Sequence, residues 1–598
     1  MEFNLSYRRN NLGISSSPYL LQHSQNPVWW QEWSGDVIKY ALEINRPLFV
    51  SVGYATCHWC HVMASEAFSD EETADFLNEN FINIKVDREQ RPDIDQFLMD
   101  FITRQTGSGG WPLNVFLTPS LRPVYALTYA PAKKTSSFES FLSVAKKIIA
   151  FYGENKDNIR EFKALTTKPE AVGENSVVRV LSDYYDPENG GFGTNHKFPP
   201  HSTLLYLLYQ LGIEESPSIR TICTKTLDAI MHRGLNDHLQ GGIFRYCVDP
   251  EWTIPHFEKM LYDQAMALWV FSLAYRVTGN GAYKQMSEKI LRCINESFFR
   301  NGLYISAHDA DTEHLEGITY LWRYEQLEEA LTPDELKQFT EVYAITPAGN
   351  FRGGNHLVRM NDKPLDAIEE KLLDLRRKRK QPSSDDKILS GLNALTAAAM
   401  IQAARHLDIP LMEGHASRLV NSIKNTFWRG SYLGHSMFNN IVQEQPFLFD
   451  AAALLFAVTL LYETDESWGI FMDDLERYVV SFRSNDRWIE SKASDFPPVN
   501  ASWFDHPVPS SVSLAEAALT RYNLLREKEV EQREYLQPFQ SDFYNLDVMV
   551  RNGLFHVYTS ADVLDWSKLP VNSIQTRGAH EQDCYMGVCR PLDLHGKA

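Results

Sequence analysis

Cysteine is scarce in this chain, which limits the kind of protein it encodes. The 598 residues contain seven cysteines, an odd number, so internal pairing would leave at least one thiol over. Small secreted domains that depend on disulfides use far more cysteine than this. The scarcity therefore favours a reducing compartment, and we expect a soluble cytoplasmic protein.

Long hydrophobic runs are also lacking. The longest apolar stretch, Ala451 to Tyr462, is too short to cross a bilayer and predicts a buried helix. The first residues, Met1 to Asn11, are polar and lack the apolar core of a signal peptide. We therefore expect no membrane partner.

Basic charge is outnumbered by acidic charge. The chain has 58 Lys and Arg against 77 Asp and Glu, a formal net charge of -19 at pH 7. Proteins that bind nucleic acids usually present a basic face, so no nucleic-acid partner is expected. Hydrophobic residues make up 44% and charged residues 23%, which excludes a wholly disordered chain. At this length, about three to six domain-sized units are expected.

The first part of the chain, to about residue 170, alternates strands and helices. Apolar and β-branched runs predict strands at Pro47–Gly53, Phe81–Val86 and Leu113–Leu117, and Val124–Thr128 is expected to pair with the third as a hairpin. Helices are predicted at Cys57–Phe68, Asp70–Asn80, Pro92–Thr106 and Ser137–Tyr152. Strands separated by helices imply an α/β domain with a mixed sheet, which we place at residues 1–170.

Beyond this boundary the pattern changes to one helix after another. The clearest predicted helices are Thr203–Leu211, Met260–Val277, Tyr283–Phe298, Leu389–Leu407, Leu448–Tyr462 and Leu514–Leu525. Glycine-containing loops recur between them, at intervals typical of helical hairpins. We predict an all-α domain at residues 171–540 that forms an (α/α)6 barrel, with an open helical solenoid as the alternative. Residues 541–598 are left unassigned or packed on the barrel.

One motif in the first domain indicates redox chemistry. Cys57-His-Trp-Cys60 follows a predicted strand and opens a predicted helix. The free N–H groups and the dipole at a helix N-terminus stabilise a thiolate, so Cys57 should be the nucleophile. Cys60, one turn later, can resolve a mixed disulfide formed at Cys57.

Three other interpretations of this motif remain open. With His61 the string matches the Cys-x-x-Cys-His pattern of covalent haem attachment, although no export signal accompanies it. Zinc could use Cys57, Cys60, His58 or His61, although no second Cys/His pair lies nearby in the sequence. The two thiols could also be inert. We expect neither a bound metal nor a cofactor.

The wider pattern resembles a known family. The strings Ser17–His23, Gly53-Tyr54, Cys57–Met63, Lys85–Glu89, Arg91–Asp95 and Gly109–Pro112 are similar to thioredoxin-domain proteins of the YyaL family, which are related to the spermatogenesis-associated thioredoxin-like protein. The resemblance implies a thioredoxin fold in which Pro112 takes the cis-proline position beside the dithiol. Ordinary thioredoxin has a buried Asp six residues before the first cysteine, and here that residue is Ser51. The charged cluster around Arg88 and Arg91 is interpreted as a salt-bridged turn in preference to an anion site.

The same resemblance extends to the helical domain. Matching strings there include Gly241–Asp249, Pro255–Asp263 and Asp309–Asp311, and the implied architecture is that of six-hairpin glycosidases and N-acylglucosamine 2-epimerases. Carboxylates and histidines of this kind could bind or transform a sugar, and aromatic side chains could stack on it. The candidate pocket residues are Arg245, Tyr246, Trp252, His256, Glu258, Tyr262, Asp263, Asp309 and Asp311.

These observations lead to one functional prediction with two alternatives. The chain is predicted to be a thiol–disulfide redox protein whose helical domain binds a carbohydrate-like small molecule. The first alternative is a sugar isomerase or glycoside hydrolase with a regulatory thioredoxin-like domain, and the second is a ligand-binding protein without catalysis. A protein carrying a thiol is the expected partner of the dithiol.

Overall fold

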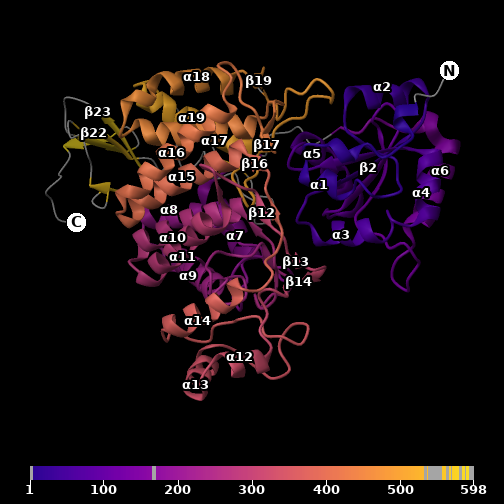
Figure 1. Ribbon diagram of the computed structural model, residues 1–598. Coiled ribbons are helices and arrows are strands. Elements are labelled where there is room, and N and C mark those ends of the chain that lie inside the picture. Colours follow the sequence, from indigo (N-terminus) through magenta and orange to yellow (C-terminus); the bar gives the residue numbers. More distant parts are fainter. Residues whose placement is uncertain are drawn as a thin grey trace.

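The computed structural model describes residues 5–163, 170–485 and 487–530. After these it describes 535–536, 555–559, 565–566, 569–577, 582–585 and 588–591. An N-terminal α/β unit lies beside a larger helical unit, and a small sheet lies on the opposite side of the helices (Figure 1). No helix among the described residues is long and apolar enough to span a membrane.

The N-terminal unit is built on a five-stranded mixed sheet with the strand order β1-β3-β2-β4-β5. β1, β3 and β2 are parallel, whereas β4 runs antiparallel to β2 and pairs with β5 as the predicted hairpin. The strands are β1 (Trp30–Glu32), β2 (Leu48–Gly53), β3 (Ile82–Asp87), β4 (Leu113–Leu117) and β5 (Pro123–Leu127). The predicted α/β domain with a mixed sheet is therefore confirmed.

Helices pack on the faces of this sheet. They are α1 (Pro18–Gln22), α2 (Gly35–Glu43), α3 (His58–Ser65), α4 (Glu71–Asn80), α5 (Pro92–Thr106) and α6 (Phe141–Asn155). Local sequence explains the limits of α5: Pro92 stands at its first position, and Gly107 ends it with a φ of 84°, a conformation that glycine adopts without strain. Short apolar strands and well-capped helices thus account for this unit.

The helical unit is organised as helical hairpins. Five helices are buried on nearly all sides and pack next to one another in chain order: α8 (His201–Ile213), α10 (Leu261–Thr278), α15 (Ser390–Leu407), α17 (Leu448–Tyr462) and α19 (Ser511–Leu525). Five amphipathic helices flank them: α7 (Glu174–Tyr184), α9 (Pro217–His232), α11 (Gly281–Cys293), α16 (Pro410–Phe427) and α18 (Gly469–Val480). The described residues thus provide ten helices of the stack, where the spacing had suggested about twelve.

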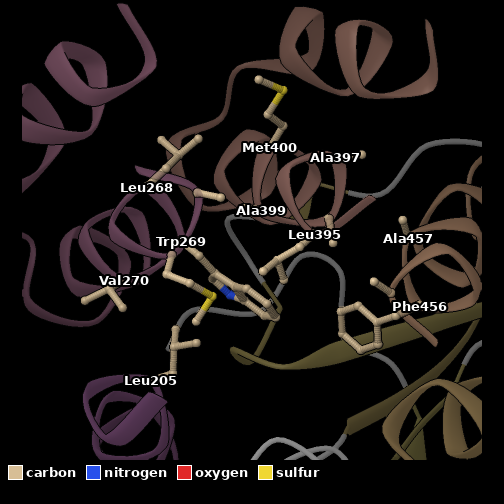
Figure 2. Close-up of a cluster of buried hydrophobic side chains, with 14 of the residues drawn as sticks. Leu205, Leu268, Trp269, Val270, Leu395, Ala397, Ala399, Met400, Phe456 and Ala457 are labelled. Atoms are coloured by element: carbon tan, nitrogen blue, oxygen red, sulfur yellow. The ribbon is translucent and has the colours of Figure 1, made fainter. Parts of the chain in front are cut away.

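The centre of the helical stack is filled by side chains. Trp269 of α10 lies 6.0 Å from Phe456 of α17 between ring centroids, and its indole N–H donates to the hydroxyl of Tyr209 at 3.3 Å. Figure 2 shows Trp269 and Phe456 among the aliphatic side chains of the surrounding helices. The inner helices therefore enclose a packed core.

Short strands line the end of the stack that faces the N-terminal unit. They are β7 (Tyr246–Cys247), β8 (Pro255–His256), β9 (Lys259–Met260), β12 (Ala307–His308), β13 (Asp311–Thr312), β14 (Leu315–Glu316), β15 (Ser384–Asp385), β16 (Ile388–Leu389), β17 (Ser436–Phe438) and β18 (Ile441–Gln443). Two further hairpins are β10 (Phe299–Arg300) with β11 (Leu303–Tyr304) and β19 (Arg483–Ser484) with β20 (Arg487–Trp488). Between β14 and β15 the chain forms a side lobe with α12 (Tyr324–Ala330), α13 (Pro333–Val342) and α14 (Asp366–Arg377).

The C-terminal part contributes further strands. β6 (Ala171–Val172) pairs with β21 (Tyr535–Leu536), so the two ends of the helical unit meet. β22 (Phe555–Thr559), β23 (Ser573–Arg577), β24 (Gln582–Tyr585) and β25 (Val588–Pro591) form a four-stranded sheet, in which a disulfide joins Cys584 to Cys589. β23 packs against α19, so the described part of this segment, left unassigned from the sequence, rests on the helical unit.

Candidate functional site

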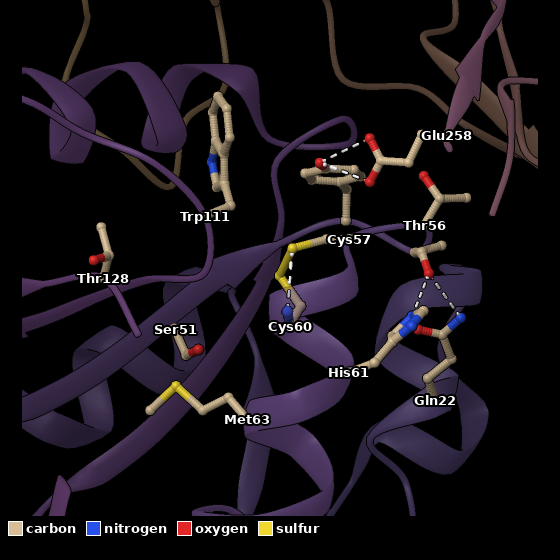
Figure 3. The surroundings of a disulfide bond; sticks show 12 residues. Gln22, Ser51, Thr56, Cys57, Cys60, His61, Met63, Trp111, Thr128 and Glu258 are labelled. Carbon is tan, nitrogen blue, oxygen red and sulfur yellow. Dashed lines mark hydrogen bonds between the residues drawn. A yellow bond between two sulfur atoms is a disulfide. The ribbon is translucent and has the colours of Figure 1, made fainter. Parts of the chain in front are cut away.

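The dithiol stands where a buried strand gives way to a helix. Cys57 is the N-cap of α3, and its sulfur accepts a hydrogen bond from the backbone N–H of Cys60 at 3.3 Å. The two cysteines form a disulfide, and they are 3% and 1% exposed (Figure 3). The peptide bond between Trp111 and Pro112 is cis, as the resemblance had implied.

Behind the dithiol, a lysine lies beside the serine that replaces thioredoxin's buried carboxylate. The Lys85 ammonium donates a hydrogen bond to the Ser51 hydroxyl at 2.9 Å, and both side chains are fully buried. Burial lowers the pKa of Lys85 well below its ordinary value. Lys85 and Ser51 therefore form a buried polar pair at the position where ordinary thioredoxin has a carboxylate.

A buried tyrosine hydroxyl reaches the same place. A Cβ atom on Gly53 would come within 2.3 Å of the Tyr19 hydroxyl oxygen and 2.7 Å of the Cys60 sulfur, so these two atoms border the space that glycine leaves. The Tyr19 hydroxyl has no hydrogen-bond partner among the described residues. Substitution of Gly53 would displace one of these two groups.

On its outer side the dithiol loop docks onto the helical unit. The Tyr54 hydroxyl donates to the Glu258 carboxylate at 3.1 Å, and the guanidinium of Arg245 contacts both the Tyr54 hydroxyl and, at 2.9 Å, Glu258. His256 lies 3.4 Å from Glu258 and 2.6 Å from Glu316. Burial alone would lower the pKa of His256, but the two carboxylates outweigh it and raise that pKa to about 9. The two carboxylates therefore favour the protonated form of His256.

A second contact involves the two histidines of the motif. His58 Nδ1 lies 2.9 Å from both carboxylate oxygens of Asp311, which stands on β13. His61 Nδ1 lies 3.7 Å from Asp311 and 3.9 Å from Asp309. Burial would raise the pKa of Asp311, but the hydrogen bonds from His58 and the nearby His61 hold it far below its usual range. Asp311 is therefore ionised, and these four side chains border an open cavity of about 700 Å³.

A third contact is centred on a buried lysine. Lys387 Nζ lies 2.8 Å from Asp87, 2.9 Å from Glu89 and 3.2 Å from Asp385. Asp87 and Glu89 belong to the N-terminal unit, whereas Lys387 and Asp385 belong to the helical unit. Burial raises the pKa of Asp385 to about 7 in spite of Lys387. The cluster therefore joins the two units through charges that no solvent screens.

A cavity of about 300 Å³ lies between the N-terminal unit and the mouth of the helical stack. Arg88 and Asp95 line it from one side, and Tyr262, Asp450 and Glu490 line it from the other. Burial raises the pKa of Glu490 to about 7 and that of Asp95 to about 6. The cavity therefore combines a fixed cation with carboxyl groups able to give or take a proton near neutral pH.

Comparison with known proteins places this arrangement in a family. Residues 9–168 match the family Thioredox_DsbH, which is described as a protein of unknown function, DUF255. Spermatogenesis-associated protein 20 of Rattus norvegicus is 30% identical over 548 residues, which cover 78% of this chain and 69% of that protein. The Homo sapiens protein is 34% identical over 450 residues, which cover 64% of this chain and 57% of that protein. This chain belongs to the spermatogenesis-associated protein 20 family.

Solved structures resemble this chain more distantly than the spermatogenesis-associated proteins do. A cellobiose 2-epimerase from Spirochaeta thermophila is 14% identical, with a TM-score of 0.41, over 59% of this chain and 78% of the epimerase. A structure named DsbH oxidoreductase is 16% identical, with a TM-score of 0.17. The match covers 21% of this chain and 85% of the DsbH chain. Similarities at this level carry no functional argument.

In this member of the spermatogenesis-associated protein 20 family, the predicted pocket residues divide among several places. Arg245, His256 and Glu258 form the network with Tyr54, and Tyr262 lines the 300 Å³ cavity. Asp309 and Asp311 border the other cavity, beside the motif histidines. These six residues therefore lie along the domain interface, and those that line a cavity divide between two of them.

Three predicted pocket residues have structural surroundings. Asp263 is buried, with a carboxylate oxygen 3.5 Å from Nε2 of His201. Tyr246 stacks on Phe198, with ring centroids 4.6 Å apart. Trp252 is 0% exposed, so its indole has no free face on which a sugar could stack.

The charged turn after β3 has the structural role expected of it. Arg91 pairs with Asp93 at 3.0 Å and, across the domain interface, with Asp495 at 2.9 Å. Arg88 stacks over the ring of Trp111, with 3.9 Å from its guanidinium carbon to the ring centroid. The salt-bridged turn is therefore confirmed, and the partner that the sequence did not reveal is Asp495.

Sequence reasoning missed several residues of the site. Lys85 and Tyr54 lay in strings quoted only for family resemblance, and Glu316 and Lys387 were given no role. Lys85 gave no local signal, because it takes one of the polar positions that alternate with apolar ones in β3. The other three residues have no pattern at short range, because the contacts that place them span 60 residues for Glu316, 204 for Tyr54 and 300 for Lys387.

Proposed function

We propose that this protein carries out thiol–disulfide exchange, with Cys57 as the attacking thiolate and Cys60 as the resolving thiol. The observation that carries the proposal is the position of Cys57 at the N-cap of α3, where its sulfur accepts the Cys60 N–H. Such a position lowers the pKa of a thiol and favours the reactive thiolate. The pairing of Cys57 with Cys60 supports the second half of the cycle, in which the dithiol closes.

The proposed cycle transfers two electrons from the dithiol to a substrate disulfide. The Cys57 thiolate attacks one substrate sulfur, and the other leaves as a thiolate that takes up a proton. Cys60 loses its proton and attacks the Cys57 sulfur, which releases the second substrate sulfur and leaves the Cys57–Cys60 disulfide. An external dithiol reductant then returns the two electrons.

The buried groups near the dithiol support the proton transfer at Cys60. Lys85 has a lowered pKa, so its neutral amine is accessible and can accept a proton through the Ser51 hydroxyl. The Tyr19 hydroxyl borders the same space beside Gly53 as the Cys60 sulfur, and in this proposal it would donate a hydrogen bond to the Cys60 thiolate while it exists. In this proposal an amine takes the part that a carboxylate plays in thioredoxin.

Replacing each cysteine by serine should separate the two roles. We expect Cys60→Ser to accumulate mixed disulfides with small disulfide probes, because no resolving thiol remains, and Cys57→Ser to accumulate none. In the reduced wild type, alkylation near neutral pH should modify Cys57 faster than Cys60. Mass spectrometry of the intact protein and of its peptides measures both results.

Cys223→Ala is the matched control, because Cys223 is a buried free thiol of α9 whose pKa burial raises. It should leave both the trapping and the alkylation pattern unchanged. Equal and slow alkylation of Cys57 and Cys60, together with no disulfide under mild oxidation, would contradict the redox proposal and favour inert thiols.

We further propose that the helical unit is an (α/α)6 barrel whose mouth binds a carbohydrate-like ligand beneath the N-terminal unit. The 300 Å³ cavity supports this, since it is at the lower end of the usual size of ligand pockets. Arg88 offers hydrogen-bond donors there, while Tyr262, Asp450 and Glu490 offer partners for sugar hydroxyls.

A sugar panel tests the ligand proposal by thermal unfolding. A ligand at about 100 times its dissociation constant should stabilise the wild type by about 2.7 kcal/mol. Glu490→Gln should abolish this stabilisation, whereas Glu444→Gln, at a side chain 56% exposed, should keep it. Absence of any shift in the wild type would leave the helical unit as a scaffold. Turnover of a sugar would instead favour an isomerase or a glycoside hydrolase.

A further inference from the structure

We propose that a divalent transition-metal cation binds between the two units, held by Nδ1 of His61 and the carboxylates of Asp309 and Asp311. His61 is on α3, one residue after the dithiol, and the two aspartates stand at β13 and just before it. One ligand atom from each of the three lies within 4.8 Å of the others. The proposal is independent of thiol exchange, since no cysteine takes part.

The hydrogen bonding of His61 turns its Nδ1 toward the carboxylates. Its Nε2 lies 2.7 Å from the carbonyl oxygen of Ala55, and a carbonyl only accepts, so Nε2 must carry the proton. The other ring nitrogen, Nδ1, faces the two carboxylates and is the atom that would bind the ion. A metal-ligating histidine usually donates its second N–H in this way, and that bond fixes the ring.

The distances around His61 leave room for an ion. Nδ1 is 3.7 Å from Asp311 and 3.9 Å from Asp309, separations too long for a hydrogen bond. Metal bonds of about 2.0–2.2 Å to nitrogen and oxygen would draw such atoms to a common centre after a small contraction. The geometry therefore fits three ligands around one cation better than direct hydrogen bonds.

The carboxylates are themselves oriented. Asp309 accepts a hydrogen bond from the Ser383 hydroxyl at 3.0 Å on one oxygen and from the Asp311 backbone N–H at 3.0 Å on the other. His58 Nδ1 lies 2.9 Å from both carboxylate oxygens of Asp311. Partners of this kind fix the direction of ligating carboxylates.

The open cavity beside the three ligands supplies a route for the ion and space for water. Its volume is about 700 Å³, and the nearby ammonium of Lys380 pairs with Glu313 at 3.1 Å instead of with the aspartates. One imidazole and two carboxylates suit Zn²⁺, Mn²⁺ or Fe²⁺, whereas Mg²⁺ and Ca²⁺ take oxygen ligands. Since its ligands come from both units, the ion would fasten the N-terminal unit to the helical unit.

Zinc binding to the full chain tests the proposal. Metal-free protein with its disulfides intact should take up one Zn²⁺ per chain in isothermal titration and equilibrium dialysis. His61→Ala should weaken the Zn²⁺ dissociation constant by more than about 100-fold, since even a residue that only orients a ligand contributes about 10–100-fold. Ser383→Ala should weaken it by about 10–100-fold, because Asp309 loses its orienting partner.

His314→Ala is the matched control, because His314 borders the same cavity without being one of the three ligands. It should bind Zn²⁺ as the wild type does. Circular dichroism checks that each variant is folded. If His61→Ala does not fold, the milder change Ser383→Ala provides the test.

Cobalt distinguishes the ligand type. Co²⁺ bound at the proposed site should show weak visible bands without thiolate-to-cobalt charge transfer, in the wild type and in a Cys57→Ser/Cys60→Ser variant alike. Three results overturn the proposal: no stoichiometric binding, equal binding by His61→Ala, or binding that requires reduced cysteines. The first would mean that the histidines and aspartates form ion pairs only, and the last would assign the zinc to the thiols.

Discussion

Replacing Lys387 by methionine should lower the free energy of unfolding by about 3–5 kcal/mol, the usual cost of removing one partner from a buried ion pair. Lys387 is 0% exposed, and its ammonium lies within 3.2 Å of Asp87, Glu89 and Asp385. Without it, three buried carboxylates face one another with no cation between them. Chemical denaturation monitored by circular dichroism measures the loss.

The effect of Lys387→Met should also be visible in domain docking, because two of its carboxylates belong to the N-terminal unit. We expect proteolysis between the two units to become faster, and small-angle scattering to report a larger radius of gyration. Lys371→Met is the control: Lys371 makes a single ion pair with Glu335 at 2.8 Å and is 41% exposed. Surface pairs contribute about 0–1 kcal/mol, so equal losses in the two variants would disprove this role of Lys387.

Asp237→Asn should produce a loss of similar size inside the helical unit. Asp237 accepts from Lys259 at 2.7 Å and from both terminal nitrogens of Arg376 at 2.8 Å. All three side chains are buried, so the amide would leave two cations without a counter-charge. The free energy of unfolding at pH 7 should fall by about 3–5 kcal/mol. Arg376 is on α14, so the side lobe should loosen first, which hydrogen exchange over α12 to α14 would reveal.

The pH dependence gives a second check on Asp237. Burial would raise its pKa, but Arg376 and Lys259 hold that pKa far below the usual range. A carboxyl group whose pKa is lower in the folded than in the unfolded protein stabilises the fold at pH values above its unfolded pKa, which is about 4. This stabilisation declines as the pH falls below that value. The difference in the free energy of unfolding between the wild type and Asp237→Asn should therefore be largest at pH 7 and should shrink below about pH 4. Asp374 is also on α14, but its side chain is 63% exposed, so Asp374→Asn should show no comparable difference in the free energy of unfolding from the wild type.

Local sequence was sufficient for most of the elements. The predicted helices at Pro92–Thr106 and Leu448–Tyr462 coincide with α5 and α17, because a clear start signal or an unbroken apolar run marks each of them. The strand β1 and the helix α2 were not predicted. β1 has only three residues, too few for a period of two to be seen, and its place is fixed by pairing with β3.

The dithiol followed from a motif a few residues long, and the family resemblance of the surrounding strings implied the cis-proline beside it. The interface around them was decided by tertiary structure alone: Tyr54 meets Glu258 across 204 residues, His58 meets Asp311 across 253, and Lys387 meets Asp87 across 300. Periodicity and capping describe how one element buries its own face. They do not say which face of one unit docks on which face of another, because that depends on the fit of two finished surfaces. The sequence thus determined the two units and the reactive pair, and only the docking of the units determined what surrounds that pair.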